Sequence, residues 1–174
     1  MASPIEFQES GVTFRLDPET ACRLDELPKQ RLAGLMTCEF VMLHTMNNRP
    51  ALVFVEAKSS LPHQQRSPEQ HRVWIDDIAT KFTQSIALWL GVAAGRHDPR
   101  IADFLPSRLK DPATVGLPIH LLLIIPTAPD DKLPDISASF NAPLHRIRTA
   151  IGRVETLRAV NYRLATRLRV AAEA

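Results

Sequence analysis

Short apolar runs in the first half of the chain have the pattern of β-strands. Residues 11–17 (GVTFRLD) alternate between apolar and polar and predict one strand. Residues 38–44 (CEFVMLH) and 51–57 (ALVFVEA) are apolar on both faces, which is typical of strands covered on both sides. Between them, Asn47 and Asn48 favour a two-residue turn, since asparagine tolerates positive φ. We therefore predict an antiparallel hairpin with strands near 37–45 and 50–58.

A helical repeat follows the hairpin. Ser67 is a suitable N-cap, Pro68 suits the first helical position, and Gln70 completes a capping box. Gly91 or Gly95 is expected to end this helix. Its apolar face, at near-helical spacing, contains Trp74, Ile78, Phe82, Ile86, Trp89 and Ala93.

The remainder of the chain adds further alternating elements. Residues 96–116 are expected to form a loop-rich segment that could hold one helical turn. Residues 117–126 (LPIHLLLIIP) predict a buried strand, and residues 127–135 predict a loop. A helix is predicted for residues 142–157. Its apolar stripe contains Leu144, Ile147, Ile151, Val154 and Leu157.

The tail, residues 159–170, fits two patterns. It alternates as a half-buried strand would, but Val160, Leu164 and Leu168 also have helical spacing. We favour the strand. The order of elements then predicts an α/β protein with a mixed central β-sheet flanked by helices, and we see no linker that divides residues 1–174, so a single domain is expected.

Composition narrows the class without identifying a function. The 174 residues are 45% hydrophobic and 23% charged, as in an ordinary globular protein. No apolar run approaches the roughly 18 residues needed to span a membrane, and the first ten residues lack the basic and apolar regions of a signal peptide. We therefore expect a cytoplasmic protein without membrane association. Cys22 and Cys38 have no metal-type spacing and imply no disulfide.

Charge is distributed unevenly along the chain. The formal net charge is +2, but residues 145–174 contain seven arginines and two acidic residues, so this segment is +5 and residues 1–144 are −3. A basic C-terminal segment beside an acidic body suits a phosphate-binding surface next to a metal site. A solvated basic face explains the same pattern equally well.

The hairpin register brings two acidic residues together. With a turn at Asn47-Asn48, Glu39 lies opposite Glu56, and Lys58 points the same way. Carboxylates across a strand pair lie roughly 4.5–5.5 Å apart at Cβ, which is destabilising without a cation. Oxygen ligands of this kind suit Mg²⁺ or Mn²⁺, and Lys58 could position the attacking water or stabilise a phosphate. The alternative to a metal site is a pair of ordinary ion pairs, in which Glu56 binds Lys58 at the surface and Glu39 binds a nearby arginine.

This combination, CEFVML…NNRPALVFVEAKSS, resembles the core of the PD-(D/E)XK, or restriction-endonuclease-like, nucleases over residues 11–125. The resemblance assigns Glu39 as the first acid, Glu56 as the second and Lys58 as the lysine, with the Ala57 carbonyl as a further metal ligand. The Pro-Asp dipeptide of the family is absent, and Glu39 stands where aspartate is usual. An extra acid from an early helix, as in some members, would be Glu19 or Glu26.

The resemblance implies a restriction-endonuclease-like fold and Mg²⁺- or Mn²⁺-dependent cleavage of phosphodiester bonds, mostly in DNA. Whether the enzyme is an endonuclease or an exonuclease, and whether it is a homodimer, stays open. The expected nucleic-acid-binding residues are Arg163, Arg167 and Arg169 of the tail and Lys81 and Gln84 of the long helix. The alternative is a catalytically silent domain of the same fold that binds nucleic acid or a protein partner.

Other chemistries lack their signatures. The six histidines show no H-x-x-x-H or H-x-E spacing, and neither G-x-x-x-x-G-K nor G-x-G-x-x-G is present. A zinc enzyme or a nucleotide-binding enzyme is therefore not favoured.

Overall fold

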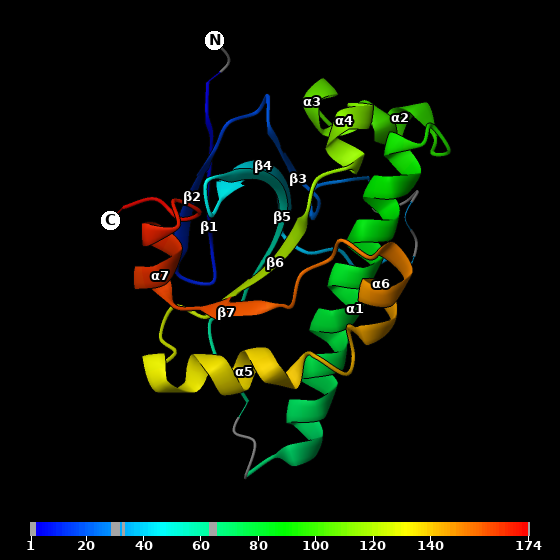
Figure 1. The fold of residues 1–174 in the computed structure, drawn as a ribbon. Coiled ribbons are helices and arrows are strands. Elements are labelled where there is room, and N and C mark those ends of the chain that lie inside the picture. The colour runs from blue at the N-terminus through cyan, green and yellow to red at the C-terminus, as the bar shows by residue number, and fades with distance from the viewer. Residues whose placement is uncertain (1–2, 29–31, 33, 63–65, 174) are drawn as a thin grey trace.

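A computed structural model describes residues 3–28, 32, 34–62 and 66–173 of the chain. Its centre is a five-stranded mixed sheet of order β3-β4-β5-β6-β7 (Figure 1). The first three strands pair antiparallel, and β6 and β7 continue the sheet in parallel with β5. The strands are β3 (Ala21–Arg23), β4 (Phe40–Met46), β5 (Arg49–Ala57), β6 (Ile119–Ile124) and β7 (Arg158–Val160).

Helices and a separate hairpin cover the two faces of this sheet. One face packs against α1 (Pro68–Ala93), α5 (Leu133–Ser139) and the segment around α6 (His145–Ile151). The other packs against a two-stranded hairpin of β1 (Ile5–Glu9) and β2 (Val12–Leu16) and against α7 (Tyr162–Arg167), as Figure 1 shows. The predicted α/β class, with a mixed sheet flanked by helices, is confirmed.

Strand β5 is buried on both faces, as its apolar sequence predicted. Leu52 and Phe54 point into the layer that contains Trp89 of α1. Val53 and Val55 point into the second layer. This arrangement places the end of β5 in a dry environment, where a charged side chain needs a partner.

The predicted turn is also present. Asn47 and Asn48 have φ values of 51° and 61°, which define a two-residue turn with positive φ at both central positions. The ladder runs in the predicted register from Met46–Arg49 to Phe40–Val55. Strand β4, the first strand of this hairpin, begins at Phe40, three residues later than expected.

Helix α1 confirms its predicted apolar face but not its predicted cap. Ile78, Phe82, Ile86 and Trp89 are buried, and the helix ends just before Gly95, which has a φ of 67°. The Ser67 side chain makes no capping hydrogen bond. The predicted capping box is therefore wrong, because the backbone at Ser67, with a ψ of 68°, departs from the extended geometry of a typical N-cap.

Several predictions between residues 96 and 157 need correction. The segment 96–116 contains three short helices instead of one helical turn. They are α2 (Pro99–Ala102), α3 (Ser107–Lys110) and α4 (Pro112–Val115). The loop predicted at 127–135 contains a 3₁₀ turn (Asp130–Lys132) and the start of α5. The helix predicted at 142–157 spans only α6, because Gly152 in the left-handed region ends it and Val154 then bridges to β6.

The tail was also predicted incorrectly. Only β7 is a strand, and α7 follows it directly. The change occurs at Asn161, whose side chain accepts a hydrogen bond from the Leu164 backbone and caps the helix. The helical spacing of Val160, Leu164 and Leu168 was therefore the correct signal. None of the helices in the described part of the chain combines the length and apolar character needed to cross a bilayer.

Candidate functional site: a buried cluster of carboxylates and lysines

Glu56 is a fully buried carboxylate near the carboxyl end of β5. Strand alternation puts its side chain on the same face as Leu52 and Phe54, toward α1, and its exposed fraction is 0%. Two residues further on, the backbone N–H of Lys58 donates to the Ile124 carbonyl of β6 and fixes the end of the strand. A carboxylate in this position requires charged or polar partners.

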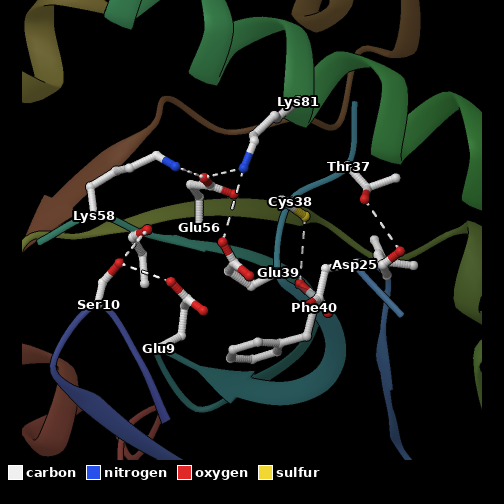
Figure 2. Close-up of polar contacts among 12 residues, drawn as sticks. Glu9, Ser10, Asp25, Thr37, Cys38, Glu39, Phe40, Glu56, Lys58 and Lys81 are labelled. Carbon is white, nitrogen blue, oxygen red and sulfur yellow. Dashed lines mark hydrogen bonds and ion pairs between the residues drawn. The ribbon is translucent and has the colours of Figure 1, made fainter. Parts of the chain in front are cut away.

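Two lysines supply those partners at a single oxygen. Oε1 of Glu56 forms an ion pair with Nζ of Lys58 at 2.8 Å and accepts a hydrogen bond from Nζ of Lys81, on α1, at 2.6 Å (Figure 2). The other oxygen, Oε2, is buried and has no hydrogen-bond partner within the described part of the chain. An unsatisfied buried acceptor of this kind costs about 1–3 kcal/mol.

Glu39 lies on the same side of the sheet as Glu56. It sits in a bend directly before β4, is 7% exposed, and has its Oε1 4.0 Å from the Lys81 ammonium. Its backbone N–H donates to the carbonyl of Val55, the residue already paired with Phe40. The strand is therefore bulged at Glu39. The shared face is as predicted, whereas the regular pairing of Glu39 with Glu56 is not formed.

The environment changes the ionisation of this cluster. Burial, followed by the negative charge of Glu56, raises the pKa of Glu39 to about 7, against an opposing effect of Lys81. For Lys81, burial lowers the pKa, but the charge and hydrogen bond of Glu56 outweigh burial and the net direction is upward. Lys81 thus stays charged while Glu39 titrates near neutral pH.

Two neighbouring residues of α1 hold the segment that precedes Glu39 in place. The Gln84 side chain accepts a hydrogen bond from the Met36 backbone at 2.6 Å, and the buried Ser85 hydroxyl accepts one from the Cys38 backbone at 2.9 Å. Gln84, predicted to contact nucleic acid, therefore holds the segment before Glu39 in place. Sequence reasoning missed Ser85, because nothing in the helical pattern indicates which backbone groups a buried serine meets.

The tip of the β1–β2 hairpin reaches the other side of the cluster. The Ser10 hydroxyl lies 3.1 Å from the Ala57 carbonyl and 3.2 Å from the Glu9 carboxylate, and can donate to either (Figure 2). The charge of Glu9 also contributes to the raised pKa of Glu39. The Ala57 carbonyl, expected to bind metal, thus has a hydroxyl beside it. Alternation of Ile5 and Phe7 before a Ser-Gly pair was the available signal for this missed hairpin.

The two other acids suggested by the resemblance are engaged elsewhere. Glu26 pairs with Arg23 at 2.6 Å, and the same guanidinium binds Asp25. Glu19 is exposed in the turn at residues 17–20. The cluster therefore consists of Glu39, Glu56, Lys58 and Lys81, with Glu9 at its edge.

The tail arginines lie away from this cluster. Arg163, Arg167 and Arg169 are exposed on or beside α7, which packs on the sheet face opposite the one that carries Glu56. Arg163 forms an ion pair with Asp130. The structure does not bring these three residues together with the carboxylates.

The donor set suits a hard cation only in part. Among the described residues, no group of three or more His, Cys, Asp and Glu side chains is placed to hold a metal ion. Two carboxylates remain, one of which offers the unpartnered Oε2 of Glu56. Mg²⁺ and Mn²⁺ accept oxygen ligands and keep several waters, so Glu39, Glu56 and water form a chemically suitable set.

The chain matches no family model, characterised protein or solved structure in the comparisons made with them. The fold and the site define the class instead: an α/β protein with a buried, charge-compensated ionic cluster at the end of a central strand. Its function is argued from that cluster.

Proposed function

We propose that the chain is a Mg²⁺- or Mn²⁺-dependent nuclease with a restriction-endonuclease-like core that cleaves phosphodiester bonds, chiefly in DNA. The observation that carries the proposal is the fully buried Glu56, with one carboxylate oxygen unpartnered among the described residues, beside Lys58 and Glu39 at the open end of hairpin β4–β5. The arrangement of an antiparallel hairpin followed by a helical crossover to a parallel strand supports the same assignment.

Each residue of the cluster has a distinct part in this proposal. Glu39 and Glu56 hold the metal ion, which when bound lowers the pKa of water and neutralises charge on a phosphate. Lys58 is the more exposed of the two lysines, with 31% of its side chain accessible against 21% for Lys81. Lys58 is therefore the better placed to orient a water molecule or to contact a phosphate oxygen.

The substrate is expected to approach where the cluster meets solvent. Ser59 and Ser60 follow Lys58 directly and are exposed, so their hydroxyl and backbone groups are available to phosphate oxygens. A substrate that approaches here would be bound mainly by the cluster and by Ser59 and Ser60. The tail arginines would contact only nucleic acid that extends around the molecule.

A second candidate is a catalytically silent domain of the same fold. It is favoured by the charge balance of the cluster, since two lysines already compensate two carboxylates without a metal. Such a domain would bind nucleic acid or a protein partner through the same surface and would cleave neither DNA nor RNA.

Cleavage by purified protein separates the candidates. Supercoiled plasmid and single-stranded DNA are incubated with Mg²⁺, with Mn²⁺ or with EDTA. We expect divalent-dependent cleavage that Lys58→Met reduces by at least about 100-fold while Mn²⁺ binding is kept, because a residue that acts in the transition state affects rate more than binding. Asp131→Asn, which removes an exposed acid that pairs with Lys132 and not with any residue of the cluster among the described ion pairs, is the matched control.

Two results would contradict the nuclease proposal. If the wild type cleaves neither substrate with either ion, the silent domain is the better account. If Lys58→Met and Glu56→Gln both cleave at the wild-type rate, any activity comes from another site or another protein.

A further inference from the structure

Lys81 holds a position between the two carboxylates. Its ammonium lies 2.6 Å from Oε1 of Glu56 and 4.0 Å from Oε1 of Glu39, and no other lysine or arginine in the described part of the chain forms an ion pair with both groups. Figure 2 shows the side chain descending from α1 toward both acids. One cation of the protein thus compensates a pair of like charges.

A divalent ion shared by Glu39 and Glu56 would need nearly the same place. Mg²⁺ and Mn²⁺ bind carboxylate oxygens at roughly 2.0–2.6 Å, so an ion between the two acids would lie within a few ångströms of the Lys81 ammonium. Two cations at that separation in a buried site repel strongly. The Lys81 ammonium and the metal ion therefore compete for the position between the two carboxylates.

The lysine can leave this position without disturbing the helix that carries it. The neighbouring residues Phe82 and Ser85 are buried and anchor the helix against the sheet, with exposed fractions of 0%. The Lys81 side chain keeps about a fifth of its surface accessible, and its four-carbon stem is flexible. A rotamer change would carry the ammonium toward solvent while the backbone stays fixed.

We propose that Lys81 is an internal counter-ion that occupies the metal position in the metal-free protein and swings out when a divalent ion binds. The inference rests on the proposed metal site. It changes the role expected for Lys81, from a contact to nucleic acid to a residue that sets how tightly the site binds metal. Lys58, which pairs with Glu56 and forms no ion pair with Glu39 among the described residues, keeps its place at the solvent side.

Calorimetric titration with Mn²⁺ tests the competition directly. Lys81→Met removes the competing charge and keeps most of the side-chain volume, so we expect its Mn²⁺ affinity to rise by about tenfold or more over wild type. The same variant should melt at a lower temperature than wild type in EDTA and regain stability with Mn²⁺, because the metal then compensates the acids. Lys132→Met, at a surface ion pair, should match wild type in both measurements.

A measurement on the wild type covers the case in which Lys81→Met fails to fold. Brief acetylation followed by mass spectrometry reports how accessible each lysine amine is. Saturating Mg²⁺ should increase the labelling of Lys81 at least about threefold relative to Lys132, as the ammonium is released to solvent. Unchanged or decreased labelling of Lys81 would overturn the proposal.

The outcomes separate this inference from the proposed function. Equal or weaker Mn²⁺ affinity in Lys81→Met, while Glu56→Gln abolishes binding, overturns the counter-ion role and leaves the metal site intact. Failure of the wild type and of Lys81→Met to bind Mn²⁺ overturns the metal site and the counter-ion role together.

Discussion

The charged residues that end strand β5 have a physical explanation at the level of single side chains. Glu56 points toward α1, where two ammonium groups meet one of its oxygens and the other oxygen has no partner among the described residues. Lys58 follows two positions later and returns to the same side. A carboxylate kept buried at this cost is more typical of a functional site than of a structural ion pair.

Glu39 makes the metal-free protein sensitive to pH. Its folded-state pKa, about 7, lies above its ordinary value of 4.5, so its contribution to stability is fully present below pH 4.5 and is lost as the pH rises through 7. Glu39→Gln removes this dependence. We expect the variant to gain roughly 2–3 kcal/mol of stability relative to wild type between pH 4.5 and 8 in EDTA.

Urea denaturation at several pH values measures this difference. The comparison near pH 4.5, where the wild-type residue is mostly protonated, serves as the internal control. A constant difference between the two proteins across the whole range would show that Glu39 titrates normally, and would remove the evidence that the two acids interact.

At the level of elements, the pattern along the chain predicted the framework of the site. Hairpin β4–β5, its register and the long helix were correct because continuous apolar runs, an Asn-Asn turn and a 3.6-residue repeat are strong local signals. The shared face of Glu39 and Glu56 followed from that register. The bulge at Glu39 was not predictable, since it depends on how segment 36–38 is held by α1.

The elements that were missed are short and depend on tertiary contacts. Strand β1 alternates regularly, but it is half exposed and lies in a separate two-stranded sheet with β2, so few buried apolar residues mark it in the sequence. The tail was assigned to a strand because alternation and helical spacing coincide there, and the cap at Asn161 decided between them. Lys81 was recognised as a polar residue of the helix, but its contacts with both acids depend on packing that a single sequence does not show.

Ser85 connects α1 to the position of Glu39. Ser85→Ala would leave the buried Cys38 N–H without an acceptor, so we expect a loss of about 1–3 kcal/mol in unfolding free energy and weaker Mn²⁺ binding. Ser139→Ala, on the exposed end of α5, removes a comparable helix hydroxyl and should change stability by less than about 0.5 kcal/mol.

Equilibrium denaturation and calorimetry on both variants check this prediction. Equal stability of the two variants would mean that the Cys38 N–H finds another acceptor. The segment before Glu39 would then not depend on Ser85.

At the level of the whole molecule, the basic C-terminal segment does not form one surface with the cluster. Helix α6 lies beside α1, whereas α7 lies across the sheet with the β1–β2 hairpin (Figure 1). A count of arginines along the sequence cannot reveal this division, because the edge strand β7 lies between the two helices in the chain and they pack on opposite faces of the sheet. The positive charge is therefore shared between two faces.

A short DNA duplex tests which face binds. Arg167→Gln with Arg169→Gln removes two exposed charges on the α7 side, and we expect its affinity for a 12-base-pair duplex to stay within about twofold of wild type at each salt concentration. Fluorescence anisotropy across a salt series provides the measurement. A salt dependence shallower by roughly two units would instead support the nucleic-acid role that the sequence predicts for these arginines.

The central claim is that Glu39 and Glu56 hold one divalent ion, and a crystal structure of the wild type grown with Mn²⁺ tests it most directly. We predict one anomalous peak roughly 2.0–2.6 Å from Oε2 of Glu56 and from a Glu39 oxygen, with the Lys81 ammonium turned away from both acids. A well-ordered cluster that shows no peak, with Lys81 still in contact with Glu56 at saturating Mn²⁺, would contradict the account.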